Sequence, residues 1–585
     1  MTSRPIAGSI RHGRTIMALG VLAMVLQLQT AALGGSDTNA RAAAASGDSA
    51  GDARRARASQ ASFERFRRAN LPWEAGGGGR CEVRLRRFCW WYDESAPGLP
   101  PEAEAIRDRR MRLLAEIDSL ATLHPGDDWL AGLRVHYRID AREHAAAESA
   151  ARGCRATRWW CDALLGYAAH VGGDAARADS SFRAALAGMD DETRCRWTDI
   201  HVLLPNDVRD RYEALACADR TPVDRRYWLL GRPRLAAAAN DWRSEFFTRR
   251  VQSWIAERAR TPHNTGWGAD AEELVLRYGW PVVWGRVQPS SVNATAADAD
   301  VVGHDPSPSF VFGPREALLD SLAEGGDDGW DLRARLGEAR YAPRGVRRVA
   351  TVATQVARFR RGDSTLVAAA FAIPDDSLRV PATRLSAALG DTIVVVGEPH
   401  PLHEGTATLL LASAPLMVEV ESLDSTTGTL ARGRTLYRAD SGAGRLSLSD
   451  LLVYRAETEP ATRLELALPR AIPGDTVGRD RPVGLFWETY GLADTGESVD
   501  VAVTVERVDR SWYRSARQVL GLSAADTPLR MRWTDARGVA GNVAPQAVSI
   551  DLANLPGGRY RLTLSLTRAG TETVTSTREI ELREP

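Results

Sequence analysis

Apolar residues recur at helical spacing between residues 100 and 220. In the stretch 101–121 they fall on one face, which predicts an amphipathic helix; the positions are Ile106, Leu113, Leu114, Ile117 and Leu120. Two helical hairpins are expected to follow, and the second, over about 165–185, has the clearer pattern. The front half of the chain is therefore predicted to be helical.

From about residue 346 the pattern changes to alternation with period two, which is typical of strands. The stretch 355–371 predicts a hairpin that turns at Arg361–Ser364, and further strands are expected at 392–396, 407–411, 416–420 and 464–468. Alternation returns at 499–505 and 560–566 and in a last strand ending at Leu582. Short alternating strands broken by turn residues favour two immunoglobulin- or fibronectin-like sandwiches. The stretch 512–522 is predicted to be a helical insertion.

The second helical hairpin resembles a tetratricopeptide repeat. Small residues stand where two helices would touch, and a large one would fill the groove between them; the positions are Leu165, Gly166, Ala169, Gly173, Ala178, Phe182 and Ala185. A weaker match opens about one repeat earlier, at Trp129. The resemblance implies a concave protein-binding surface, with flanking helices covering the ends of the array.

The N-terminus has the order of a secretory signal peptide, predicted over 1–34. Arg4, Arg11 and Arg14 precede a mostly apolar run at 16–28, and small residues follow it. The alternative is an uncleaved membrane anchor, although the run is shorter than the roughly 20 apolar residues of a span. Residues 35–78 are rich in Ala, Gly and Ser and lack apolar periodicity, so a flexible linker is expected there.

Six cysteines all lie between residues 81 and 217. In an exported chain an even number of cysteines predicts disulfides, and sequence proximity favours three local pairs. These pairs are Cys81–Cys89, Cys154–Cys161 and Cys195–Cys217. A zinc site would need close CxxC pairs or interleaved histidines, which the sequence lacks, so no metal or other cofactor is predicted.

Charge and motifs exclude several classes of function. The 75 basic residues balance 75 acidic ones, so nothing favours nucleic acid as a partner. Every basic residue among the 75 is arginine, which removes Schiff-base chemistry and the lysine of a phosphate-binding loop. The Arg361-Gly362-Asp363 tripeptide is interpreted as a turn. His263 and His304, in a segment rich in tryptophan and arginine, are interpreted as solvated or structural residues.

That segment, over 221–345, resembles the GWxTD-type domain of exported bacterial proteins of unknown function. The matching residues are Gly266, Trp267, Asp270, Arg277, Tyr278, Gly279 and Pro281. The chain departs from the pattern at Ala269, where the family has threonine, and 485–492 resembles the strand that opens the family's terminal β domain. The resemblance implies a helix, a turn and a strand ending at Tyr278, with Trp267 in the core and Asp270 capping the following segment or pairing with Arg277. It implies no known activity.

The predicted fold is multidomain α+β: a helical-repeat half, a mixed α/β segment and two β-sandwiches. After the signal peptide and linker, the expected division is a disulfide-bearing helical domain over 79–220, the GWxTD-like domain over 221–345, and sandwiches over 346–475 and 476–585.

The favoured function is that of a non-enzymatic, periplasmic or extracellular scaffold that binds a protein partner in the cell envelope. Two alternatives stay open: a carbohydrate- or cell-wall-binding module that uses exposed tryptophans, and an envelope enzyme with its site near Asp270 and Arg277. Contact with a membrane is expected only through an uncleaved signal sequence.

Overall fold

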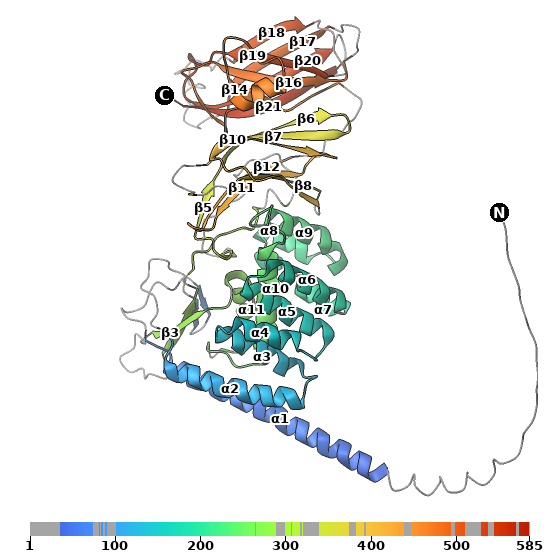
Figure 1. The fold of residues 1–585 in the computed structure, drawn as a ribbon, viewed down its shortest axis with the longest axis vertical. Helices are drawn as coiled ribbons and strands as arrows, with labels where there is room; N and C mark the ends of the chain where they lie inside the picture. Colours follow the sequence, from blue (N-terminus) through green and yellow to red (C-terminus); the bar gives the residue numbers. More distant parts are fainter. Residues whose placement is uncertain are drawn as a thin grey trace, which may run out of the picture.

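The computed structural model describes residues 35–73, 81, 83–85, 88–90, 101–263, 265–287, 299–305, 307–315, 319, 339–373, 379, 382–390, 393–437, 446–492, 498–508, 528–535, 543–568 and 572–583. The molecule is elongated, with helices toward one end and stacked sheets toward the other (Figure 1). This arrangement confirms a helical half followed by β-sheets. None of the described helices is both long and apolar enough to cross a bilayer.

The helical half packs around one large hydrophobic core. Its helices are α1 (Gly35–Asn70), α2 (Glu104–Leu123), α3 (Asp128–Asp140), α4 (His144–Arg152), α5 (Arg158–Gly172), α6 (Ala175–Gly188), α7 (Asp191–Thr198), α8 (Asn206–Glu213), α9 (Cys217–Leu230), α10 (Asp241–Ala256) and α11 (Ala269–Tyr278). The expected border at 220/221 falls inside α9, and core residues on both sides of it belong to the same cluster. The two domains predicted over 79–345 therefore share a core.

The two predicted hairpins are present as α3–α4 and α5–α6. Gly166 on α5 lies against the ring of Phe182 on α6, where an added Cβ would stand 2.9 Å from the ring. The small residue thus lets the two helices approach closely, as the sequence pattern indicated. The side chain of Asp174 accepts a hydrogen bond from the backbone N–H of Arg177 and starts α6.

The expectation of a flexible linker over 35–78 was wrong for most of its length, because Gly35–Asn70 forms α1. One face of α1 is buried, but it is of mixed polarity: Ala56, Gln60, Phe63, Glu64 and Arg67. Gln60 and Glu64 both hydrogen-bond to Tyr137 of α3, at 2.8 and 2.6 Å. A search for apolar periodicity misses a helix whose buried face includes polar side chains.

A small sheet joins distant parts of the chain in the order β1-β2-β4-β3. Its strands are β1 (Val83–Leu85), β2 (Phe88–Trp90), β3 (Val283–Val287) and β4 (Asp300–His304). Phe88 and Trp90 from this sheet enter the core of the helical half.

The first β unit holds two sheets that share one core. One has the order β5-β12-β11-β8-β9 and the other β10-β7-β6. The strands are β5 (Arg348–Thr351), β6 (Ala353–Arg361), β7 (Ser364–Ala372), β8 (Arg384–Leu389), β9 (Ile393–Val396), β10 (Glu404–Leu411), β11 (Met417–Asp424) and β12 (Thr429–Leu436). The β6–β7 hairpin and its turn at Gly362–Asp363 confirm the prediction.

The second β unit also has two sheets around one core. In one, β16 pairs with β13, β14 and β19; the other has the order β15-β21-β20-β17-β18. The strands are β13 (Ser447–Leu448), β14 (Leu452–Arg455), β15 (Thr476–Gly478), β16 (Val483–Tyr490), β17 (Val499–Arg507), β18 (Leu529–Asp535), β19 (Val543–Ile550), β20 (Gly558–Arg568) and β21 (Glu572–Arg583).

Two details of the β half differ from the prediction. The border at 475/476 was wrong, because β13 and β14 already pair with β16 of the second unit. The strand expected at 464–468 is the short helix α13 (Leu464–Ala467), which buries Leu464 and Ala467 at a spacing of three while Leu466 is exposed. The helical insertion predicted at 512–522 lies outside the described residues.

The β6–β7 hairpin connects the two units because both of its faces are buried. Val356, Val367 and Ala369 face the first unit's core, whereas Phe359 and Ala368 pack on β14, β16 and α13. The almost continuous apolar run of β7 is therefore that of a strand covered on both sides.

Candidate functional site: an arginine-lined pocket

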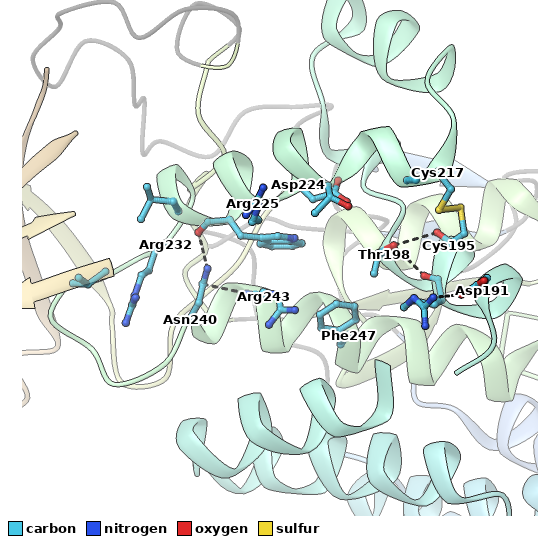
Figure 2. A pocket seen from close by; sticks show the side chains of 16 residues that line it. Asp191, Cys195, Thr198, Cys217, Asp224, Arg225, Arg232, Asn240, Arg243 and Phe247 are labelled. Carbon is cyan, nitrogen blue, oxygen red and sulfur yellow. Dashed lines mark hydrogen bonds and ion pairs between the residues drawn. A yellow bond between two sulfur atoms is a disulfide. The ribbon is translucent and has the colours of Figure 1, made fainter. Parts of the chain in front are cut away.

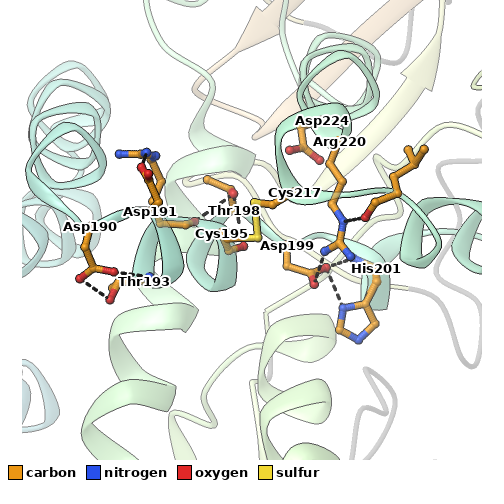
Figure 3. Close-up of a disulfide and its surroundings, with 12 residues drawn as sticks. Asp190, Asp191, Thr193, Cys195, Thr198, Asp199, His201, Cys217, Arg220 and Asp224 are labelled. Atoms are coloured by element: carbon orange, nitrogen blue, oxygen red, sulfur yellow. Dashed lines mark hydrogen bonds and ion pairs between the residues drawn. A yellow bond between two sulfur atoms is a disulfide. The ribbon is translucent and has the colours of Figure 1, made fainter.

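The Cys195–Cys217 disulfide ties α7 to the start of α9 (Figure 3), with the two Cα atoms 5.9 Å apart. The side chain of Asp190 accepts the backbone N–H of Thr193 at 2.8 Å and caps α7. The two helices so held form neighbouring walls of a pocket.

This pocket has a volume of about 750 Å³ and lies between α7, α9, α10 and the edge of the first β unit (Figure 2). Phe247 and Arg243 come from α10, Trp228 and Leu229 from α9, and Val394 from β9. The other lining residues are Asp191, Arg194, Cys195, Thr198, Cys217, Ala218, Thr221, Asp224, Arg225, Arg232 and Asn240. Its size is within the range of sites for small molecules or peptide side chains.

Four arginines line the pocket against two aspartates. Arg194 pairs with Asp191 on its own helix, and Arg243 pairs with Asp179 of α6 at 3.3 Å while its guanidinium lies 5.0 Å from the centre of the Phe247 ring. Burial lowers the pKa of Arg243 and outweighs the carboxylate of Asp179, which raises it. The guanidinium is thus fixed in place between an apolar wall and a carboxylate.

Asp224 contributes less negative charge to the pocket than a fully ionised aspartate would. The Tyr212 hydroxyl donates a hydrogen bond to it at 2.8 Å, and burial raises the pKa of Asp224 to about 7. At neutral pH this carboxyl is therefore protonated in a substantial fraction of molecules. With Asp179 included, three carboxyls meet the four arginines, and the partial protonation of Asp224 adds to the small positive excess that a bound anion would neutralise.

Guanidinium groups above apolar side chains are suited to binding a carboxylate or a phosphate attached to an apolar body. The two cysteines of the lining are joined in a disulfide, and the Thr198 hydroxyl donates to the carbonyl of Arg194 at 3.0 Å. Among the described lining residues no nucleophile stands beside a histidine or other base. In the described part of the chain, no group of three or more His, Cys, Asp and Glu residues is placed to hold a metal ion.

The predicted motif residues lie elsewhere, around the buried His263. Trp284 is buried, Trp267 and Trp280 are half-buried, and the rings of Trp280 and Trp284 lie 5.5 and 4.8 Å from that of His263. Burial lowers the pKa of His263 to about 3, so its ring is neutral and packs as an aromatic group. This packing favours a structural role over a stacking platform for sugars.

The strand expected to end at Tyr278 is the helix α11, and its Asp270 and Arg277 do not form the expected ion pair. Seven residues along a helix separate them by roughly 10 Å. Asp270 is exposed in the first turn, whereas Arg277 pairs with Glu273 at 3.0 Å. The arrangement does not assemble a site from Asp270 and Arg277.

Gly279 ends α11 for a structural reason. Its φ of 85° lies in the left-handed region, and an added Cβ would stand 3.2 Å from Arg249. Arg249 donates to the carbonyls of Leu276 and Arg277 at 2.9 and 3.0 Å and pairs with Glu245 at 2.6 Å. The motif's Tyr278, Gly279 and Pro281 are all buried in this packing.

The three local disulfides are confirmed: Cys81–Cys89, Cys154–Cys161 and Cys195–Cys217. Cys154 and Cys161 connect the end of α4 to α5, as expected for a link between successive hairpins. Disulfides are typical of proteins that fold outside the reducing cytoplasm.

Sequence reasoning did not find the pocket. Its arginines come from α7, α9, α10 and the loop between the last two, and only the packing of these elements brings them together. The density of arginine in 221–250 was the available signal.

Comparison with protein-family models and with curated proteins finds no match. One solved structure is described as "Structural insight into host cell surface retention of a 1.5-MDa bacterial ice-binding adhesin". The similarity covers 40% of this chain and 66% of that one, at 11% sequence identity and a TM-score of 0.13. At this TM-score the likeness carries no argument.

Proposed function

We propose that this chain is an exported, non-enzymatic scaffold of the cell envelope that binds a protein partner through its helical half. The observation that carries the proposal is the pocket between α7, α9 and α10. Its arginines and apolar walls provide for binding, and its described lining lacks a paired nucleophile and base.

Other features support the same function. The helical hairpins, proposed to be tetratricopeptide-like, offer a surface of the kind that such repeats use for proteins. The three disulfides fit the proposed signal peptide and an oxidising compartment. The stacked sheets extend the molecule away from the helices (Figure 1), which suits a spacer in an envelope assembly. We retain membership of the GWxTD-type family as part of this proposal.

Photo-cross-linking in intact cells of the source organism tests the proposal. A photoreactive residue would replace Met111, Leu123 or Arg225 in the helical half, or Leu410 in the β half, all of which are exposed. We expect discrete adducts of protein size from at least one helical position, and none from Leu410. If no helical position gives a protein adduct in the envelope fraction, the scaffold function is wrong.

A further inference from the structure

The outer edge of β9 borders the arginine-lined pocket. Val394 of β9 lines the pocket and packs toward Leu229 and Leu230 of α9. Val395 faces the other way, into the core of the first β unit. Because side chains alternate along a strand, Val396 shares the face of Val394, and its side chain is 40% exposed there.

β9 is an edge strand. It pairs with β8, and within the described part of the chain no strand lies on its other side. The backbone N–H of Gly397 donates to the carbonyl of Leu385, so Val395 and Ile393 continue the bonds to β8. By the same alternation, the N–H and C=O groups of Val394 and Val396 point outward.

This short edge carries apolar side chains and lacks the charged and proline residues that block strand addition. Ile393 is 57% exposed, and no proline or charged residue interrupts the strand. A strand added here would lie roughly 4.8 Å from β9 and would direct alternate side chains to the face of Val394, beside the arginines.

We propose that β9 and the pocket together receive an extended segment of a partner protein, which adds to the sheet as a strand and places acidic side chains among Arg194, Arg225 and Arg243. The main chain of the segment bonds to Val394 and Val396, and its apolar side chains, on the opposite face from the acidic ones, cover Ile393. Charge complementarity selects the acidic segment, because the four lining arginines outnumber the three carboxyls around them, those of Asp191, Asp224 and Asp179. This inference rests on the proposed scaffold function and names the chemistry of the partner.

The test uses the full chain and a fluorescent decapeptide of alternating Glu and Val, followed by fluorescence anisotropy. We expect binding that weakens at high salt, and at least tenfold weaker binding of the matching Lys–Val peptide. A Glu–Val peptide with alternate backbone nitrogens methylated removes the main-chain donors without touching the protein. It should also bind at least tenfold more weakly.

Two variants separate the charge from the strand edge. Arg225→Glu reverses an exposed charge of the pocket, and Val396→Pro removes an outward N–H but no bond to β8. Each should weaken binding of the Glu–Val peptide at least tenfold. The matched controls are Arg158→Glu, an exposed arginine of α5 outside the pocket, and Thr408→Pro on the exposed edge of β10; both should bind like the wild type.

Binding that ignores Arg225→Glu, or that treats the Glu–Val and Lys–Val peptides alike, overturns the proposal. The proposal is also overturned if Arg225→Glu weakens binding but Val396→Pro and backbone methylation do not. The pocket would then hold an anion without strand addition. Dextran sulfate provides a further check. If it binds, and Arg225→Glu weakens its binding while Val396→Pro does not, the pocket would be assigned to a sulfated polyanion in place of a protein segment. Protein adducts at Met111 or Leu123 combined with a failed peptide test would refute this inference and leave the scaffold function standing.

Discussion

Glu64 is buried between α1 and α3 with only a partial set of partners. Tyr137 donates to one of its carboxylate oxygens at 2.6 Å, and burial, which outweighs the nearby Arg67, raises the pKa of Glu64 to about 7. The same contact holds α1 against the helical half. The packing of α1 against α3 should therefore depend on pH through the protonation of this one carboxyl.

The sign of this link can be predicted. Between the ordinary pKa of 4.5 and about 7, the folded chain keeps a proton that the unfolded chain has lost, so the free energy of unfolding falls as the pH rises. The loss is complete above pH 7 and is on the order of 3 kcal/mol. Glu64→Gln should remove this part of the pH dependence and raise stability at pH 8.

Urea unfolding followed by tryptophan fluorescence at pH 5 and pH 8 measures the effect, since most tryptophans lie in the helical half. The exposed Glu104→Gln on α2 serves as the control and should keep the wild-type difference between the two pH values. A Glu64→Gln variant with the same pH difference as the wild type would contradict the assignment.

The tryptophans around His263 should differ in their contribution to stability. Trp284 is 5% exposed and packs on Phe88, His263 and Trp280. Trp284→Ala should therefore reduce the free energy of unfolding by roughly 3–5 kcal/mol. Trp267 is only half-buried, so Trp267→Ala should reduce it clearly less. Thermal unfolding of the two variants side by side checks the order, and equal shifts would mean that burial does not explain their role.

At the scale of elements, the Cys195–Cys217 bond should stabilise more than Cys154–Cys161, because it closes a longer loop. The separations are 22 and 7 residues. Chain entropy gives about 3.4 kcal/mol for the longer loop and about 2.4 for the shorter.

Replacing each pair by two alanines and comparing the unfolding midpoints tests this order. The Cys195→Ala/Cys217→Ala variant should also weaken the binding of any ligand in the pocket, because α7, which forms one wall, is then no longer tied to α9. The Cys154→Ala/Cys161→Ala variant is its control, because neither of those cysteines lines the pocket. Loss of binding in the control alone would place the site elsewhere.

Many of the elements that sequence patterns predicted have one apolar face. α2, the two hairpins and the alternating strands β17 and β20 belong to this group. The pattern failed for α1, whose buried face carries Gln60, Glu64 and Arg67. The family resemblance failed for α11, where it implied a strand. The three disulfides followed from proximity alone. The pocket could not be predicted, because its arginines meet only after α9 and α10 pack together.

For the whole molecule, the contact between the helices and the sheets depends on buried charges. Arg434 of β12 is fully buried, pairs with Glu419 of β11 and donates to the carbonyl of Leu230 at 2.7 Å. Glu419 accepts the N–H of Leu235 at 2.8 Å, and Glu421 pairs with Arg234 at 3.1 Å. The strands thus hold the loop that follows α9, which is also a border of the pocket.

Glu419 and Glu421 differ in their pKa values. Burial raises the pKa of Glu419, but the Arg434 guanidinium outweighs this and lowers it to about 2. Burial and the neighbouring Glu419 raise the pKa of Glu421 to about 8, so at neutral pH Glu421 holds a proton that it donates to Glu419. The junction therefore contains the ionised pair Arg434–Glu419 and a protonated Glu421, which accepts a hydrogen bond from Arg234.

Arg434→Met should disrupt this junction, because it leaves the ionised Glu419 buried without its cation. Removing one partner of such a pair typically reduces stability by roughly 3–5 kcal/mol. Adding Glu419→Gln removes the isolated charge yet keeps an oxygen for the N–H of Leu235, so the double variant should recover at least half of the loss. Hydrogen–deuterium exchange of 229–240, with thermal unfolding, measures both effects: fast exchange in Arg434→Met and partial protection in the double variant.

Arg158→Met, which removes an arginine that is 87% exposed, controls for loss of a cation and should exchange like the wild type in this segment. If Arg434→Met left the exchange of 229–240 unchanged, the apolar contacts of Leu229, Leu230 and Leu235 with the sheet would suffice to join the two halves, and the ion pair would contribute little to the junction.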